Sequence, residues 1–144
     1  MESITKIVEF LPPLITAMPL TLLLTATAGV IGLIFGTLSA LARLSNSRIL
    51  KWPAFVYTFI FRGTPLLVQL YLIYYGLGQI LPGTWVRHSF LWPYMRDGLW
   101  YAVFALSLNQ GAYNAEVIRG AINSIPRGQI EAALSIGMSR FKIL

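Results

Sequence analysis

The sequence predicts an all-α integral membrane protein that forms a single domain. Of its 144 residues, 56% are hydrophobic and only 11% are charged, whereas a soluble domain carries about 25% charged residues. Long uncharged stretches, the first of which runs from Phe10 to Ala42, alternate with short basic segments. This pattern is typical of helices that cross a bilayer and of the loops that join them.

The first predicted span covers residues 20–41. Its 22 residues carry no charge, and as a helix they would extend about 33 Å, enough to cross a hydrocarbon core about 30 Å thick. Pro12, Pro13 and Pro19 precede this span. Because proline disrupts a helix, they predict an irregular approach to the span along the membrane interface.

The second predicted span covers residues 65–80 and follows a break at Arg62-Gly63-Thr64-Pro65. Thr64 suits a helix N-cap, and Pro65 suits the first helical position. The aromatic segment that begins at Trp52 would then lie along the cytoplasmic interface, with Arg62 among the headgroups. The alternative is a continuous helix that buries Arg62 at a cost of roughly 3 kcal/mol, so we favour the break.

The third predicted span covers residues 98–119 and is the most polar. Asn109, Tyr113 and Glu116 follow the i, i+4, i+7 spacing of one helical face. A rise of 1.5 Å per residue puts Asn109 about 16 Å deep, near the midplane, and Glu116 about 27 Å deep, near the inner headgroups. Asn109 is the better pathway candidate, and Glu116 could serve only as an interfacial anchor. Hydrogen bonding between helices is an equally weighted alternative for Asn109 and Gln110.

Pairs of small residues four apart predict where helices pack closely. Gly32 and Gly36 form such a pair in the first span, and Gly111 and Ala115 form another in the third. Small side chains let two helix backbones approach.

Basic residues favour an orientation with the N-terminus outside and residue 144 in the cytoplasm. The predicted inside segments hold seven, against three outside, Lys6, Arg87 and Arg96, and positive charge accumulates on the cytoplasmic side. The formal charge of +6 does not indicate nucleic-acid binding, because the basic residues form no patch along the sequence.

We predict no catalytic, cofactor or metal site. The sequence has no cysteine and a single histidine, His88, for which a solvated loop position is the ordinary interpretation. It lacks the phosphate-loop, His-Glu-x-x-His and Gly-x-Ser-x-Gly motifs. Its five acids lie in separate segments.

Residues 124–140 form a predicted cytoplasmic segment that contains one short helix. Gln129 to Ile136 are good helix formers, with Ile130, Ala133 and Leu134 on one face. Eight residues do not hold a helix alone. We therefore expect this helix to dock in a groove on a partner.

Glu131-Ala132-Ala133 followed by Gly137 resembles the cytoplasmic loop motif of permease subunits in binding-protein-dependent ABC importers. Further stretches resemble the polar amino-acid branch of that family: Phe61 to Gln69, Ala112-Tyr113, Glu116, Arg119-Gly120 and Gly128-Gln129-Ile130. The outside stretch from Arg87 to Pro93, with Arg96-Asp97, resembles subunits that serve histidine, arginine, ornithine and opines.

This resemblance implies the MetI-like permease fold in a bacterial inner membrane, with three of an expected five spans and a docking helix present. Two permease subunits, identical or homologous, would form the pathway, a pair of ATPase subunits would bind the docking helices, and a periplasmic binding protein would deliver the amino acid. The resemblance assigns ATPase coupling to Gly128, Glu131, Ala132, Ala133 and Gly137.

In that framework Asn109, Tyr113 and Glu116 are candidates for the translocation pathway, and Arg62 to Pro65 for a helix break at the cytoplasmic gate. Leu134-Ser135 departs from the small-plus-basic pair usual in the family. The chain stops at Leu144, before two further spans, so we expect a fragment or a truncation. The alternatives are a non-transporting or defunct membrane assembly subunit and, third, a secondary transporter.

Overall fold

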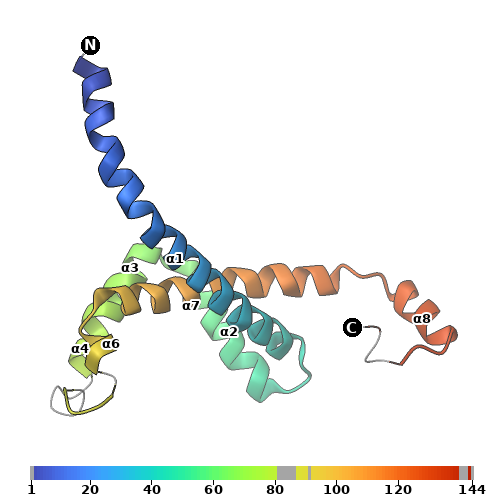
Figure 1. Cartoon of the computed structure of the whole chain (residues 1–144). Coiled ribbons are helices and arrows are strands. Elements are labelled where there is room, and N and C mark those ends of the chain that lie inside the picture. The colour runs from blue at the N-terminus through green and yellow to red at the C-terminus, as the bar shows by residue number, and fades with distance from the viewer. Residues whose placement is uncertain (1, 81–86, 91, 140–142, 144) are drawn as a thin grey trace.

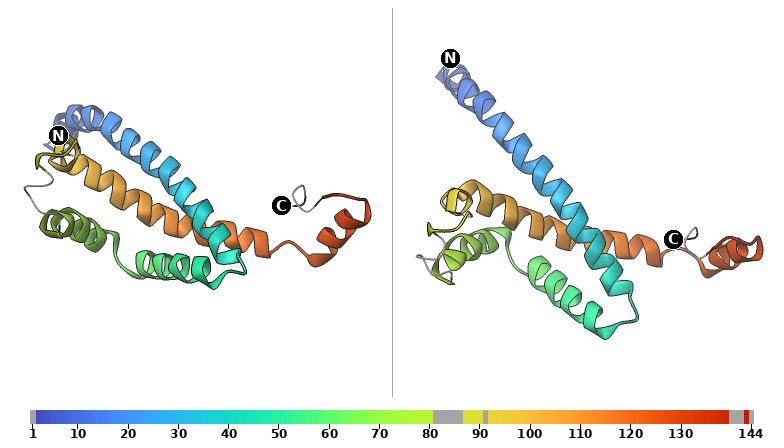
Figure 2. Two further views of the ribbon diagram at one scale, coloured as in Figure 1. Left: turned by 90° about the horizontal axis from the view of Figure 1, so that it is seen from below. Right: turned by 60° about the horizontal axis from the view of Figure 1, so that its bottom comes forward.

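The computed structural model describes residues 2–80, 87–90, 92–139 and 143, and the regular secondary structure within them is entirely helical. This confirms the all-α prediction for the described residues. The elements in order are α1 (Glu2–Leu44), α2 (Arg48–Gly63), α3 (Leu66–Tyr71), the π-helix η1 (Leu72–Gly76), α4 (Leu77–Ile80), α6 (Trp92–Met95), α7 (Gly98–Asn123) and α8 (Arg127–Ser135). Figures 1 and 2 show α1 and α7 crossing each other, with α8 apart from the other helices.

Helix α1 runs without a break through Pro12, Pro13 and Pro19, which corrects the expected irregular approach. Proline's fixed φ is compatible with a helix, so its cost is one lost hydrogen bond and crowding in the preceding turn, and helices in lipid tolerate this. Threonine hydroxyls along α1 also bond internally, as when Thr27 Oγ1 donates to the Leu23 carbonyl at 2.7 Å. These threonine hydroxyls are thereby satisfied within the helix.

Within the described residues, the most extensive packing is that of α1 against α7, and glycines lie at the crossing. A Cβ added to Gly32 would lie 2.9 Å from the Cβ of Gln110, and one added to Gly36 would lie 2.6 Å from the Cβ of Asn114. A Cβ on Gly111 would meet the hydroxyl of Tyr57 at 2.7 Å. The predicted close-packing positions Gly32, Gly36 and Gly111 are therefore confirmed.

Helices α2 and α3 meet at the predicted break, where the chain bends by 112°. The details of the junction differ from the prediction. Pro65 takes the N-cap position of α3, and Thr64 is the C-cap of α2. The Thr64 hydroxyl donates to the Ile60 carbonyl at 2.8 Å, so it binds the end of α2 instead of capping α3. Beyond the break, helical structure continues to Ile80 through the π-helix.

By length and composition, the part of α1 from Phe10 to Leu44 could cross a membrane, and so could α2 with α3 and η1 if that bent pair is one span. Helix α7 has 26 residues, or about 39 Å, and is long enough to span a membrane. Its composition is too polar for it to count as a candidate span by the same criteria. Its role as a third span stays a prediction. Three positions named in the predictions lie outside the described residues: Arg140, the end of the predicted cytoplasmic segment, Leu144, predicted to lie in the cytoplasm, and Leu91, in the outside motif.

The α1–α7 crossing generates a matched pair of substitutions. Gly36→Ala should lower the thermal midpoint of the chain in mild detergent, because overpacking costs about 1–3 kcal/mol. Gly29→Ala, on the same helix with no heavy atom within 4 Å of its added Cβ, should leave the midpoint unchanged or slightly higher. Equal midpoints for both variants would show that the crossing is not tightly packed.

Candidate functional site

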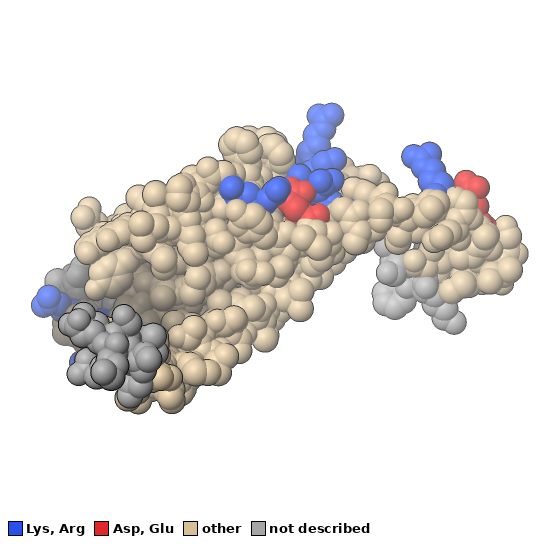
Figure 3. Space-filling view, turned by 90° about the horizontal axis from the view of Figure 1, so that it is seen from above, with Lys and Arg blue, Asp and Glu red and all other residues tan. Residues whose placement is uncertain are grey.

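A carboxylate on α7 contacts arginines from three positions in the chain. Glu116 Oε1 accepts from Nη1 of Arg43, at the end of α1, and lies 3.3 Å from Nη1 of Arg62, at the end of α2. Its Oε2 accepts from Nη2 and Nε of Arg119, one turn along α7, at 2.8 and 3.0 Å. Figure 3 shows basic side chains gathered around one acidic group near the middle of the view.

Burial of these four side chains is graded. Arg43 and Glu116 have 12% and 18% of their side-chain surface exposed, against 34% for Arg119 and 43% for Arg62. Arg43 also donates to the hydroxyl of the buried Thr58 at 3.0 Å. Partly buried pairs are less screened by solvent than surface pairs, so the Arg43–Glu116 pair dominates the cluster. Three arginines and one glutamate leave a formal charge of +2.

A second polar cluster lies at the bend between α2 and α3. Gln69, only 5% exposed, donates from Nε2 to the Phe61 carbonyl at 2.8 Å and to Thr64 O and Oγ1 at 3.0 and 2.8 Å. Asn109 Nδ2 on α7 donates to Gln69 Oε1 at 3.0 Å and to the Phe61 carbonyl at 3.3 Å. The Phe61 and Thr64 carbonyls, at the end of α2 and in the break, are thus hydrogen-bonded to side chains.

The three polar residues predicted on one face of α7 all turn toward α2 and its break. Asn109 bonds to the bend, Tyr113 lies under the guanidinium of Arg62 at 5.7 Å from its ring centre, and Glu116 pairs with Arg43 and Arg62. The structure therefore confirms that these three residues share one face of α7, and this face packs against α2 and its break. Interhelical hydrogen bonding, the alternative for Asn109, is present, whereas Gln110 bonds within α7 to Asn114 at 3.3 Å.

Asn109 also borders a cavity of about 300 Å³ between α1, α3 and α7. Thr25 and Gly29 of α1, Leu66 of α3 and Gln110 of α7 are among its other lining residues. A small number of polar groups in a mostly apolar wall is typical of sites for small molecules. Hydrogen bonding to the bend and contact with a solute are therefore compatible roles for Asn109.

Helix α8 carries the predicted coupling residues away from the bundle (Figure 1). It begins at Arg127, before the expected start at Gln129, so Gly128 lies in its first turn. The Gln129 amide donates to the Pro126 carbonyl at 3.0 Å and closes that turn. Ile130 and Leu134 are exposed, and Ala133 is half-buried.

The end of α8 is closed by a left-handed glycine. Gly137 has φ +81°, which glycine adopts without steric cost. The Gly137 amide donates to the Leu134 carbonyl at 3.0 Å, and the Met138 amide donates to the Ala133 carbonyl at 3.1 Å. These two bonds form a Schellman motif, which gives the short helix a defined end.

Three residues that join the helices are not among the site residues predicted from the sequence. Arg43 is one of the seven basic residues that favour the orientation, and Gln69 ends the Phe61 to Gln69 motif. Tyr57, whose hydroxyl donates to the Leu108 carbonyl of α7 at 2.6 Å, belongs to none of the predicted sites. A lone glutamine in an apolar helix is a usable signal, because it needs a partner there; the partners themselves depend on the fold.

The protein family described as "Binding-protein-dependent transport system inner membrane component" matches residues 28–144. The solved structure described as "Crystal structure of an amino acid ABC transporter with histidines" superimposes with a TM-score of 0.74 at 37% identity, covering 94% of this chain and 58% of that one.

Curated relatives are similar over most of this chain. The octopine transport system permease protein OccM of Rhizobium radiobacter is 49% identical over 130 residues, or 90% of this chain and 52% of that protein. The nopaline transport system permease protein NocM of Agrobacterium fabrum is 45% identical over 96% of this chain and 57% of its own length. The histidine/lysine/arginine/ornithine permease protein HisM of Escherichia coli is 42% identical over 89% and 53%. The chain thus spans about half the length of these relatives.

The arginine cluster predicts a graded loss of stability. Glu116→Gln should lower the free energy of unfolding by about 2 kcal/mol, less than the roughly 3–5 kcal/mol for breaking a fully buried pair, because solvent partly screens these charges. Arg43→Gln should cost more than Arg62→Gln, which is more exposed. Denaturation of each variant in mild detergent measures its free energy of unfolding.

Glu131→Gln is the matched control for this series, because Glu131 is exposed on α8 and forms no ion pair within the described residues. It should leave the unfolding curve unchanged. If Glu116→Gln were as harmless as Glu131→Gln, the cluster would contribute nothing to stability.

Proposed function

Because this chain belongs to the family of binding-protein-dependent transport system inner membrane components, we propose that it is a membrane-spanning permease subunit of an ABC importer for amino acids. It would catalyse no reaction itself, since ATP would be hydrolysed by a separate subunit. The observation that carries this proposal is α8, a short helix held away from the bundle with apolar residues exposed.

The partner of α8 would be a cytosolic ATPase subunit. A nine-residue helix gains little stability from its own hydrogen bonds, so its defined start and glycine-closed end are best explained by a groove that receives it. Ala132 and Ala133 present little side-chain bulk and allow close approach of a partner's backbone. Gly128, Glu131, Ala132, Ala133 and Gly137 would form this coupling surface.

Transport would follow from movement of the docking helices. In the assembled importer two permease subunits would surround a pathway, and a periplasmic binding protein would deliver the solute at its outer end. Closure of the ATPase pair would displace α8, and rigid-body rocking of the membrane helices would open the pathway to one side at a time. Arg62, Gly63, Thr64 and Pro65, at the 112° bend, would form part of the cytoplasmic gate.

The solute would be a basic amino acid or an opine. The names of the relatives OccM, NocM and HisM refer to octopine, to nopaline and to histidine, lysine, arginine and ornithine, which supports this class. Asn109 and Tyr113 would face the pathway, and the cavity of about 300 Å³ beside Asn109 lies at the lower end of the size range of small-molecule sites. Glu116 would act at the inner end through its arginine cluster.

The chain would sit in the bacterial inner membrane with its N-terminus in the periplasm and residue 144 in the cytoplasm. This orientation puts Arg43, Arg62 and Arg119 on the cytoplasmic side of the membrane, in agreement with the positive-inside tendency. It also puts α8 on the side where ATP is available.

Gly137→Leu tests the coupling role. A branched side chain at φ +81° is strained by roughly 1–2 kcal/mol, so the end of α8 should reorganise. In the reconstituted importer containing this chain, uptake should fall at least tenfold while ATP hydrolysis no longer responds to the solute.

Gly120→Ala is the control, because a Cβ there meets no heavy atom within 4 Å and the residue has no positive φ. It should preserve both uptake and stimulated hydrolysis. Normal uptake together with normal stimulated hydrolysis in Gly137→Leu would refute the coupling assignment.

Asn109→Leu tests the pathway role. It removes the polar group from the cavity wall and the hydrogen bond to Gln69, so uptake rate or solute preference should change while the subunits still assemble. Gln69→Leu removes the same hydrogen bond but leaves Asn109 in the cavity, which separates the two roles. If Asn109→Leu left rate and preference unchanged in an assembled importer, Asn109 would be structural only.

A further inference from the structure

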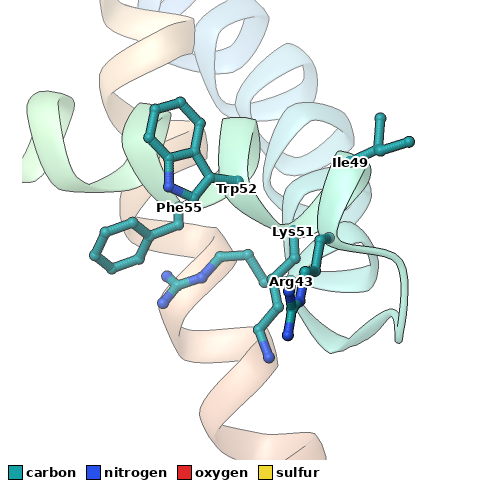
Figure 4. Close-up of a pocket in the computed structure, with 6 residues that line it drawn as sticks. Arg43, Ile49, Lys51, Trp52 and Phe55 are labelled. Atoms are coloured by element: carbon teal, nitrogen blue, oxygen red, sulfur yellow. The ribbon is translucent and has the colours of Figure 1, made fainter.

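A hollow of about 570 Å³ lies at the corner between the end of α1 and the start of α2, apart from the cavity beside Asn109. Its walls combine basic, aromatic and aliphatic side chains, contributed by Arg43, Arg48, Ile49, Lys51, Trp52 and Phe55. Figure 4 shows the basic side chains and the aromatic rings that border it. A volume of this size is within the range of small-molecule sites, about 300–1,000 Å³.

The spacing of α2 puts both kinds of side chain on the same face of one helix. Arg48, Lys51, Trp52 and Phe55 follow the i, i+3, i+4, i+7 pattern. Trp52 is 70% exposed and Phe55 47%. Exposed aromatic rings next to basic groups on an amphipathic helix are typical of a membrane surface.

The positive charge of the hollow is only partly balanced by acidic side chains of the described residues. Arg43 shares the carboxylate of Glu116 with two other arginines. Among the described residues, Arg48 and Lys51 take part in no ion pair, and both are exposed. The hollow is therefore complementary to an anion that also carries an apolar part.

We propose that this hollow binds the headgroup and upper acyl chain of an anionic phospholipid of the cytoplasmic leaflet. Arg48 and Lys51 would contact the phosphate, while Trp52, Phe55 and Ile49 would contact the chain. Arg43 would set the positive potential of the inner wall. Basic pockets beside membrane helices recognise anionic headgroups in this way. Lipid binding here would be independent of which solute crosses the membrane.

Quenching by brominated lipid tests the proposal. The chain with Trp85, Trp92 and Trp100 replaced by Phe keeps Trp52 as its single reporter; a second variant keeps only Trp100, on α7. Each is reconstituted in phosphatidylcholine vesicles doped with brominated phosphatidylglycerol or with brominated phosphatidylcholine. Trp52 should be quenched preferentially by phosphatidylglycerol, whereas Trp100 should show no preference.

Removal of charge should remove the preference at Trp52. Arg48→Gln and Lys51→Gln should each lower the relative affinity for phosphatidylglycerol by about fivefold, the effect of about 1 kcal/mol for each basic residue near an anionic surface. Arg127→Gln, an exposed basic residue on α8, should leave it unchanged.

Three results would overturn the proposal. One is equal quenching of Trp52 by the two brominated lipids, and another is an equal preference at Trp100, which would indicate a general enrichment of anionic lipid. The third is loss of the preference on addition of millimolar glycerol 3-phosphate, which would make the hollow a site for free phosphate. Persistence of the preference at that concentration supports the lipid.

Discussion

Glu116 contacts arginines at the ends of α1 and α2 and on its own helix, and the arrangement of these three helices depends on that contact. Charged side chains near a hydrocarbon core are costly unless they pair. With one carboxylate for three guanidinium groups, the ends of α1 and α2 must converge on the same turn of α7. The pairing thus brings Arg62, the last basic residue of α2, to α7, and α3 then departs from that point.

A second constraint acts on the opposite side of α7. Gly32 and Gly36 of α1 let its backbone approach that of α7 so closely that any side chain would collide. Helix α7 therefore has two faces with different chemistry, a small-residue face against α1 and a polar face against α2 and its bend. Both constraints fall on one helix, and most of the packing in the described part of the chain passes through it.

This central position of α7 bears on the proposed coupling. Only residues 124–126 separate its end from the start of α8, so a displacement of α8 would act first on α7. Through Glu116 it would act on the ends of α1 and α2, and through Asn109 and Gln69 on the bend. A displacement of α8 would in this way be transmitted to both the proposed gate and the cavity beside Asn109. The many exposed apolar side chains of α1, such as Leu22 and Val30, are suited to lipid or to further membrane helices.

Much of this organisation could be predicted from the sequence because it follows from local patterns. Charge-free stretches indicated α1, the Arg62 to Pro65 segment indicated a break, small-residue pairs marked the close crossing, and the i, i+4, i+7 spacing of Asn109, Tyr113 and Glu116 indicated one face of α7. The prediction that the prolines make the approach to α1 irregular was wrong, because local propensity does not account for the prolines that a long helix tolerates. The choice of partners was decided by tertiary structure alone. Arg43 and Glu116 are 73 positions apart and Gln69 and Asn109 are 40 apart, and no periodicity in the sequence specifies which polar groups meet when helices cross.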